Sequence, residues 1–314
     1  MELFPSNSKF NFMRVRVASL AVAMVLMLVA FWAIGFKGFN FALDFTGGTA
    51  AELRFDVPVD VEQVRRGLQE AGFESPVVQA IGTGNDIVVR LKPRESDGDA
   101  AASGQAIVRA AQAAAAPAKL LRSGYESIGP QIGKELAING MYAAIFVVLG
   151  FLVYVWIRFE LKFAIAALIT TLHDVVLVAG WFALTGHEFD LTVLAGVLSV
   201  MGYSINDTIV VFDRVRENFR TLHKLTPIEV LNRSINQTLS RTIITSFVAL
   251  LTVLALYFFA GASLRGMAES QIIGIVIGTL SSIFVACPLL QMLGANKQDL
   301  MPRLRDDAEL ARRP

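Results

Sequence analysis

Cysteine is nearly absent from this chain: among 314 residues, Cys287 is the only one. A single cysteine excludes an intrachain disulfide and a cysteine metal cluster. Its place in an apolar run predicts a buried thiol that packs as a small hydrophobic side chain. Histidine is also scarce, and His173, His187 and His223 are too scattered to indicate a metal site. We therefore expect no metal centre and no other cofactor.

Charged residues are few as well, at 18% of the chain, whereas 54% of the residues are hydrophobic and the mean hydropathy is +0.55. A soluble domain of this length is far less apolar, so the composition indicates a membrane protein surrounded by lipid. The net charge is only +1, and the basic residues do not cluster on one soluble domain. The charge pattern therefore gives no reason to expect nucleic acid as a partner.

Six apolar stretches have the length of about 20 residues that crosses roughly 30 Å of hydrocarbon. They are residues 17–36, 136–157, 163–184, 191–212, 242–263 and 271–293. The first follows a basic start and could be taken for a secretory signal, but it is too long for one and lacks an Ala-x-Ala cleavage pattern. We expect it to be a retained membrane anchor.

The positions of lysine and arginine predict the orientation. These residues concentrate in 1–16, in the connections after the second and fourth spans, and in the tail 294–314, whereas the two short loops on the opposite side hold only Arg265. Short loops rich in lysine and arginine remain in the cytoplasm. We therefore predict cytoplasmic termini, a cytoplasmic loop at about 213–241, and a domain 37–135 on the outer side, with spans two to six within 136–293.

The domain 37–135 has a mixed pattern of strands and helices. Short apolar or alternating runs at 49–57, 77–81, 87–91 and 119–123 predict strands, with a turn at 82–85, and helical spacing at 61–71 and 100–115 predicts helices. The order β-α-β-β-α-β is typical of a ferredoxin-like α+β fold. The domain has no nucleophile–base set and no phosphate loop, so we predict a binding or lever domain and not an enzyme.

Glycines mark both ends of this domain. Gly47 and Gly48 lie in the segment Leu-Asp-Phe-Thr-Gly-Gly-Thr, and Gly129 and Gly133 lie in Gly-Pro-Gln-Ile-Gly-Lys-Glu-Leu. Glycine adopts positive φ angles and tight turns that other residues resist. These glycines fit either rigid turns between helix and strand or hinges that let the domain move, and the pattern alone favours rigid turns.

The fourth span contains Asp207, about five residues before its predicted cytoplasmic end and roughly 8 Å deep. A carboxylate costs a few kcal/mol or more at membrane depth, so it persists where it is paired or functional. Ser204 lies one turn earlier on the same face, and Asn206 and Thr208 flank Asp207 as possible hydrogen-bonding neighbours. We predict a functional site here, against the alternative of a polar group that only orders the bundle.

Two further residues are candidates for this site. Arg241 follows a capping-box helix start at 226–229, and if that helix continues into the fifth span, its guanidinium can pair with Asp207. The alternative is an arginine that extends its charge to the membrane surface. Asp174 lies about eleven residues into the third span, roughly 17 Å deep, and directly follows His173, whose side chain should point about 100° away. Asp174 is either functional or an interior hydrogen-bonded group.

With these residues in view, the chain resembles the SecF family of protein-export membrane subunits. The resemblance covers nearly the whole chain: the six spans, the outer domain after the first span, and four local signatures. The signatures are residues 43–49, residues 129–136, the His173-Asp174 pair and residues 202–218. The last run, Gly-Tyr-Ser-Ile-Asn-Asp-Thr-Ile-Val-Val-Phe-Asp-Arg-Val-Arg-Glu-Asn, is highly specific. The family more often has glycine where Ala42 stands.

The resemblance implies half of an RND-type transporter, completed by SecD as a twelve-span pseudo-symmetric unit in the bacterial inner membrane, with the outer domain in the periplasm. It further implies the SecYEG translocon as a partner, with YajC and YidC as additional candidates, and unfolded polypeptides as the cargo. In this picture the proton gradient drives late-stage export and protons are the coupling ion. Asp207, Arg241 and Asp174 would form the proton relay, and Gly47 and Gly48 fit a hinge as well as a rigid turn.

Two other classes share part of the pattern. An RND-type efflux subunit would share the buried aspartate, but it needs much larger outer domains and normally twelve spans in one chain. An intramembrane aspartyl protease needs two carboxylates that share a proton. Asp174 and Asp207 differ by roughly 5–7 Å in predicted depth, and the Gly-x-Gly-Asp pattern of such proteases is missing. We keep efflux as the alternative and set the protease aside.

Overall fold

The computed structural model describes residues 10–74, 76–81, 84–91, 100–222 and 224–296. Residues 1–9 of the predicted N-terminal segment, residues 82 and 83 of the predicted turn, His223, and residues 297–314 of the predicted tail lie outside this description. The chain forms two compact units. One contains most of the long helices, and the other, Phe41–Ala143 together with Glu188–Leu191, contains the larger sheet.

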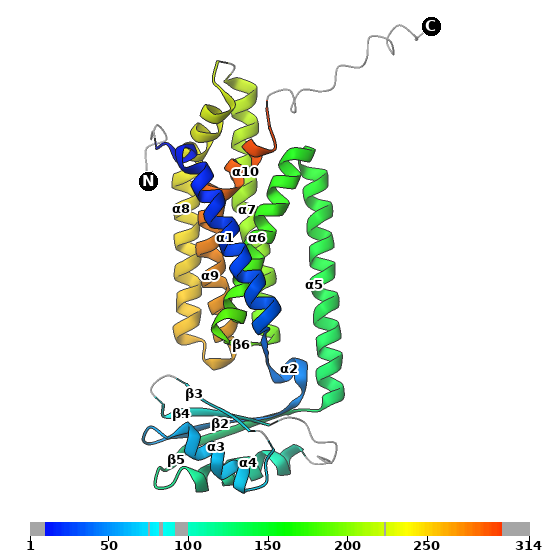
Figure 1. Ribbon diagram of the computed structural model, residues 1–314. Helices are drawn as coiled ribbons and strands as arrows, with labels where there is room; N and C mark the ends of the chain where they lie inside the picture. The colour runs from blue at the N-terminus through cyan, green and yellow to red at the C-terminus, as the bar shows by residue number, and fades with distance from the viewer. Residues whose placement is uncertain (1–9, 75, 82–83, 92–99, 223, 297–314) are drawn as a thin grey trace, which may run out of the picture. The chain divides into compact units, whose positions relative to one another are not determined.

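Six helices in the described part of the chain are long and apolar enough to cross a membrane, so the predicted helical membrane fold is confirmed (Figure 1). They run over Phe12–Lys37, Gln131–Arg158, Leu161–Thr185, Leu191–Thr221, Pro227–Phe259 and Arg265–Met292. The labelled elements within them are α1 (Arg16–Trp32), α5 (Pro130–Arg158), α6 (Leu161–Thr185), α7 (Leu191–Thr221), α8 (Pro227–Phe259), α9 (Arg265–Ser281) and α10 (Cys287–Met292). The sixth span is interrupted by a π-helical turn, η4 (Ser282–Ala286), between α9 and α10.

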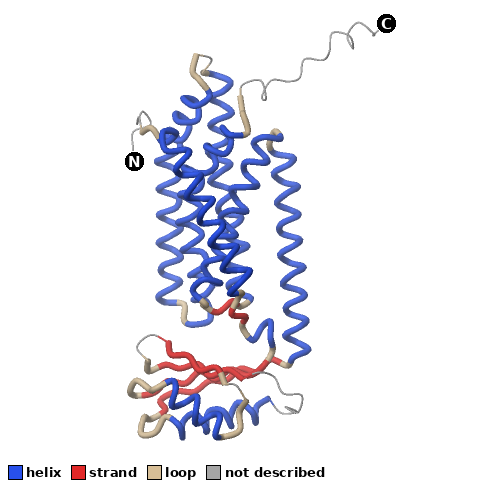
Figure 2. The backbone as a smooth tube through the Cα atoms, viewed as in Figure 1, coloured by secondary structure: helices blue, strands red, loops and turns tan. Residues whose placement is uncertain are grey.

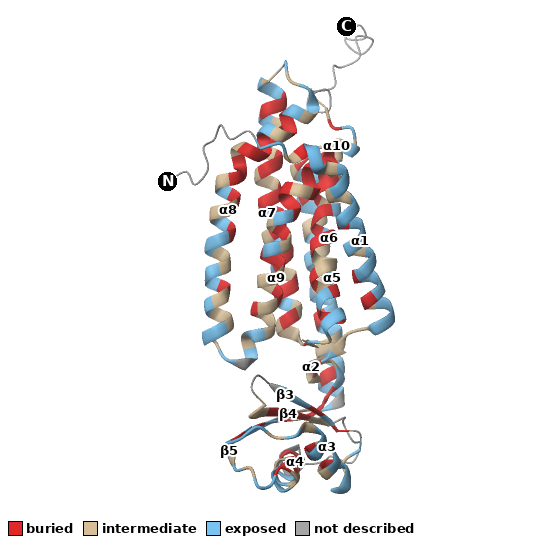
Figure 3. Cartoon of the chain, turned by 60° about the vertical axis from the view of Figure 1, so that its left-hand side comes forward, coloured by how far each residue is buried: buried red, intermediate tan, exposed pale blue. Residues whose placement is uncertain are grey.

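Helices α6, α7 and α9 carry most of the buried surface of the bundle. About half of each apolar window is buried in these helices, whereas α1, α5 and α8 are largely exposed (Figure 3). Small residues allow close contact, as membrane helices require. A Cβ atom on Gly274 of α9 would lie 2.1 Å from the Val200 side chain of α7, and one on Gly180 of α6 would lie 2.5 Å from Ala30 of α1.

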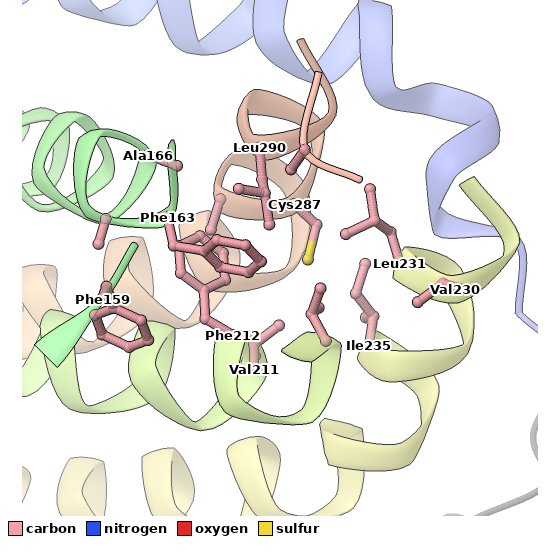
Figure 4. Packing of buried hydrophobic residues seen from close by; sticks show 14 of the residues in the cluster. Phe159, Phe163, Ala166, Val211, Phe212, Val230, Leu231, Ile235, Cys287 and Leu290 are labelled. Carbon is pink, nitrogen blue, oxygen red and sulfur yellow. The ribbon is translucent and has the colours of Figure 1, made fainter. Parts of the chain in front are cut away.

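Aromatic and branched side chains from several helices pack together in one cluster (Figure 4). Phe163 and Phe212 are fully buried and meet edge to face, with ring centroids 5.6 Å apart. Cys287 is buried in the same cluster, near Leu231 and Ile235. The prediction that this thiol serves as a small hydrophobic group is therefore confirmed.

The segment 213–241, predicted as the cytoplasmic connection between the fourth and fifth spans, is mainly helical. Helix α7 continues to Thr221, and α8 begins at Pro227 behind the predicted capping box of Thr226 and Glu229. The reason is amphipathicity, because the buried face of the segment joins the cluster of Figure 4. The residues on that face are Val215, Phe219, Val230, Leu231, Ile235 and Leu239. The helix that begins at Pro227 continues into the fifth span as far as Phe259, which meets the condition set for Arg241.

The larger sheet forms a ferredoxin-like domain. Its elements follow the predicted order: β2 (Gly48–Phe55), α3 (Val61–Glu70), β3 (Val77–Ile81), β4 (Asp86–Leu91), α4 (Ala100–Ala114) and β5 (Leu120–Ile128). The strands are arranged β3-β4-β2-β5 with antiparallel neighbours. Figure 2 draws the strands in red. Alternate residues of β2 (Ala51, Leu53, Phe55) pack against Val64 and Leu68 of α3 and Ile107 of α4. Strand β5 is longer than predicted because it pairs with β2 along nearly its whole length.

Short elements surround the start of this domain. Strands β1 (Asn40–Phe41) and β6 (Glu188–Phe189) pair as a separate two-stranded sheet. A single helical turn, α2 (Leu43–Thr46), then leads into Gly47 and β2. The remaining short turns are η1 (Phe12–Val15), η2 (Ala33–Lys37) and η3 (Ala262–Leu264).

Candidate functional site

Asp207 lies inside the bundle with both carboxylate oxygens hydrogen-bonded. The residue is 6% exposed. Thr242 of α8 donates its hydroxyl to Oδ1 at 2.8 Å, and Ser282 of η4 donates its hydroxyl to Oδ2 at 2.5 Å. Two other helices therefore supply the hydrogen bonds that this buried carboxylate requires.

Asp174 of α6 forms a second centre of the same kind and is fully buried. Its Oδ2 accepts hydrogen bonds from the hydroxyls of Ser204 on α7 and Ser281 on α9, the latter at 2.6 Å. His173 Nδ1 lies 2.8 Å from Oδ1, so the ring turns back onto its sequence neighbour despite the predicted angle of about 100°. The imidazole Nε2 is buried and has no partner among the described residues.

Adjacent residues on the sixth span connect the two centres. Ser281 ends α9 and Ser282 begins the π-helical turn η4, and each donates to a different carboxylate. On α7, Ser204 and Asp207 are three residues apart and therefore share a face. π-Helical turns are frequent at functional sites because they change which side chains face a neighbouring helix.

A further row of hydroxyls lies beside these centres. Tyr203 of α7 donates to Ser246 of α8 at 2.8 Å, and Thr279 of α9 donates to the same serine oxygen at 2.7 Å. Ser282 lies one turn after Thr279 and donates to its carbonyl oxygen as well as to Asp207. Polar groups from α7, α8 and the sixth span thus form a layer within the apolar bundle.

The other residues predicted near Asp207 differ in their burial and contacts. Asn206 is exposed, because residues adjacent on a helix point about 100° apart. Thr208 is fully buried, but its hydroxyl has no partner among the described residues. Arg241 is exposed, and no ion pair joins it to Asp207 in the described chain. Its neighbour Thr242 faces the carboxylate instead.

The two aspartates are separate sites and do not form a pair. Asp174 bonds with Ser204, Ser281 and His173, whereas Asp207 bonds with Thr242 and Ser282. Aspartyl proteases need two carboxylates in contact that share one proton. This arrangement agrees with setting the protease hypothesis aside.

Charged groups in the last three turns of α7 form ion pairs apart from these centres. Asp213 accepts hydrogen bonds from Arg158 and Arg216, and Arg216 also pairs with Glu160 at 2.7 Å. Both arginines lie over the ring of Phe159. The group joins α5, α6 and α7, and each carboxylate in it has an arginine partner, unlike Asp174 and Asp207.

The predicted glycine turns have different local structures. Gly47 and Gly48 have φ angles of +67° and +122°. A Cβ atom on Gly48 would lie 2.3 Å from the Leu91 carbonyl oxygen. Gly133 belongs to α5 and not to a turn. A Cβ atom on Gly133 would lie 2.7 Å from the backbone nitrogen of Gly47. Gly129, just before α5, has open space at its Cβ position.

Sequence reasoning did not identify Thr242, Ser281 or Ser282 as part of the site. The available signal was a pair of serines in the otherwise apolar sixth span and a threonine directly after Arg241. Among the described residues, no group of three or more histidine, cysteine, aspartate or glutamate side chains is arranged to hold a metal ion.

The fold and site define a multi-pass α-helical membrane protein with two hydroxyl-bonded carboxylates inside its bundle. Comparison with known proteins gives the family. Residues 108–296 match the model of the C-terminal part of the SecD/SecF protein export membrane proteins, and residues 32–59 match the SecD/SecF GG motif. The second match includes Gly47 and Gly48.

Individual relatives agree with this match. The protein translocase subunit SecF of Pseudomonas aeruginosa is 44% identical over 93% of this chain and 94% of its own length, and that of Escherichia coli O157:H7 is 39% identical over 93% and 90%. The crystal structure of Thermus thermophilus SecDF, a translocon-associated membrane protein, superposes with a TM-score of 0.81 at 39% identity, covering 92% of this chain. The chain spans only 39% of that SecDF chain.

The chain belongs to the SecF family of protein translocase subunits. The predicted resemblance is confirmed, as is its class, a membrane transport component and not an enzyme.

Proposed function

We propose that this subunit couples the proton gradient to late-stage polypeptide export. The observation that carries the proposal is that Asp207 and Asp174 are two buried carboxylates, each held by hydroxyl groups of neighbouring helices. An ionised carboxylate inside a membrane bundle is costly, and such residues commonly belong to proton relays. A proton that binds at either carboxylate removes the charge.

The hydroxyl partners make proton binding a structural event. A hydroxyl can donate to an ionised carboxylate or accept a hydrogen bond from a protonated one. When Asp207 gains a proton, one of its oxygens becomes a donor, so Thr242 or Ser282 must reorient. These residues belong to α8 and to η4, and protonation therefore changes the contacts that α7 makes with two other spans.

Arg241 acts in a different state of this cycle in our proposal. Its guanidinium is exposed next to Thr242, so a rotation of α8 would exchange the hydroxyl for a cation beside Asp207. Asn206, which is also exposed, would then be available to a partner instead of supporting the carboxylate. His173, through its free Nε2, provides a route for protons to Asp174.

The family and the lysine and arginine pattern support a proposal for the membrane location, the orientation and the partners of this subunit. We infer a bacterial inner-membrane location, cytoplasmic termini and a periplasmic ferredoxin-like domain. The larger size of the SecDF chain supports SecD as the partner that completes the unit, and its description as translocon-associated supports SecYEG as the assembly it joins. Unfolded polypeptides in transit are the proposed cargo. Small-molecule efflux is less well supported, because the relatives are named as protein translocase subunits.

The test is export of a secreted protein into inverted membrane vesicles, with and without a proton gradient. Asp207→Asn keeps the side-chain volume but cannot exchange a proton, so we expect the gradient to lose its stimulating effect while gradient-independent export remains. Glu217→Gln is the matched control, because Glu217 is an exposed carboxylate on the same helix. Full gradient stimulation in Asp207→Asn would show that the residue is only a structural polar group.

A further inference from the structure

The second part of the connection between α6 and α7 belongs to the outer domain's compact unit. Residues Glu188–Leu191 are grouped with Phe41–Ala143, the unit that contains the ferredoxin-like sheet. Leu191 is at the same time the first residue of α7, the helix that carries Ser204 and Asp207. The segment therefore links the outer domain directly to the start of the helix that bears the proposed proton site.

Asp44 holds this start through a backbone contact. The Asp44 carboxylate accepts a hydrogen bond from the backbone N–H of Leu191 at 3.0 Å. The first N–H groups of a helix have no partner within the helix, and the positive end of its dipole favours an anion. Asp44 supplies both the acceptor and the charge. It does so from α2, the turn immediately before Gly47 and Gly48.

Arg90 makes a second contact to the same segment. Its guanidinium forms an ion pair with Glu188 and is only 14% exposed. Burial lowers the pKa of Arg90 from its usual range, and the carboxylates of Asp190 and Glu52 oppose this effect. Arg90 lies on β4, where it pairs with Ala50 of the central strand β2, so its backbone is held by the sheet.

Backbone and aromatic contacts complete the connection. The N–H of Ala42 donates to the carbonyl oxygen of Phe189 at 3.0 Å. The ring of Phe189 contacts those of Phe41 and Phe45, with centroids 6.1 and 6.2 Å apart. The segment is thus held by main-chain, aromatic and charged contacts on both sides of Asp44.

We propose that Asp44 and Arg90 are positioning residues that fasten the start of α7 to the outer domain, so that movement of α7 during the export cycle moves this domain. The inference rests on the proposed proton coupling at Asp207. We call Asp44 and Arg90, with their partners Leu191 and Glu188, the α7 anchor. The tight packing of Gly48 against Leu91 and of Gly133 against Gly47 makes the domain root stiff enough to transmit such a movement.

The experiment compares variants of the anchor in the inverted-vesicle export assay, with the subunit in its native complex. Asp44→Ala removes the acceptor, whereas Asp44→Asn keeps an oxygen that can accept from Leu191. Arg90→Gln removes the charge, whereas Arg90→Lys keeps it. Arg54→Gln is the matched control, because Arg54 forms an ion pair with Asp86 on the same domain and lies outside the anchor.

We expect Asp44→Ala and Arg90→Gln to lower gradient-stimulated export several-fold, while gradient-independent export and the amount of assembled complex stay at the native level. Asp44→Asn, Arg90→Lys and Arg54→Gln should retain most of the stimulation. Native stimulation in both Asp44→Ala and Arg90→Gln would overturn the inference. A parallel loss of assembled complex and of all export would also count against it, since that is the behaviour of a purely structural contact.

Asp207→Asn in the same assay reports separately on the proposed function. If Asp207→Asn loses the stimulation while the anchor variants keep it, proton coupling stands and the anchor inference alone fails. If Asp207→Asn keeps the stimulation, the proposed function fails and the anchor inference fails with it.

Discussion

At the residue scale, the buried carboxylates accept hydrogen bonds from hydroxyl groups of neighbouring helices. Asp207 accepts from Thr242 and Ser282, and Asp174 accepts from Ser204 and Ser281. In contrast, Asp213 at the end of α7 pairs with two arginines. A cation would hold a carboxylate ionised, whereas a hydroxyl accommodates either protonation state. The neutral partners therefore suit residues that exchange protons.

Thr242 allows this idea to be tested without altering the carboxylate. Thr242→Val keeps the shape of the side chain but removes the hydroxyl that donates to Asp207, and Thr242→Ser keeps the hydroxyl. We expect Thr242→Val to lose most gradient stimulation and to destabilise the bundle by about 0.5–1.5 kcal/mol, the range for hydrogen bonds between membrane helices. Thr242→Ser should stay near native in export.

The measurements are gradient-stimulated export and the unfolding midpoint of the purified protein. Equal export by the valine and serine variants would mean that this hydroxyl has no part in proton coupling and only packs against Asp207.

At the scale of elements, the root of the ferredoxin-like domain is a close crossing of three chain segments. A Cβ atom on Gly48 would clash with the Leu91 carbonyl oxygen. A Cβ atom on Gly133 of α5 would likewise clash with the backbone of Gly47. Both Gly47 and Gly48 have positive φ angles. A hinge needs space in which the backbone can rotate, and this crossing has little. We therefore favour the rigid turn over the hinge.

Replacing Gly48 tests the rigid turn. Gly48→Ala should cost about 2 kcal/mol or more, because the new Cβ meets a backbone oxygen and the φ angle disfavours any L side chain. Gly124→Ala on β5 is the matched control, because its Cβ position has nothing within 4 Å. We expect the control to change stability by no more than about 0.5 kcal/mol.

Protease resistance of the outer domain and its unfolding midpoint measure these effects. On the rigid-turn view, stability and export fall together in Gly48→Ala. A variant with native stability that nevertheless exports poorly would instead support the hinge.

At the scale of the whole molecule, large apolar residues remain exposed on α1, α5 and α8. Figure 3 draws many residues of these helices in the pale blue of exposed positions. Examples are Phe146 and Trp156 on α5, at 78% and 70% exposed, and Phe247 on α8 at 58%. Lipid can cover such faces. The polar groups Asn206 and Arg241 are also exposed, however, and within a bilayer they need polar partners. A second set of helices would provide them.

We therefore predict that mild detergent extraction yields this subunit together with SecD. The complex should survive size-exclusion chromatography. Arg241→Leu should weaken it, because the exposed guanidinium would lose its polar partners on SecD. Phe247→Leu serves as the control, since it changes an exposed position on the same helix without altering charge. A monomer that remains stable and supports gradient-driven export without SecD would contradict the prediction.

The sequence by itself determined the properties that depend on local pattern. Hydrophobic length is a property of continuous segments, so the six spans could be read directly. The alternation of strand and helix periods likewise predicted the β-α-β-β-α-β order, with β3 found at the predicted 77–81. Asp207 was recognisable because a carboxylate stands out in an apolar segment regardless of the fold around it.

The tertiary structure alone decided which groups surround that carboxylate. Thr242 and Ser282 are 35 and 75 positions away from Asp207 in the chain, and only helix packing brings them to it. Packing also fixes the rotation of each helix about its axis, which is why Thr242 faces inward while its neighbour Arg241 faces outward. The π-helical turn at Ser282–Ala286, which follows directly on Ser281, shows no periodic signal in the sequence. The hydrogen bond from the Leu191 N–H to the Asp44 carboxylate likewise joins residues 147 positions apart, so no local pattern could reveal it.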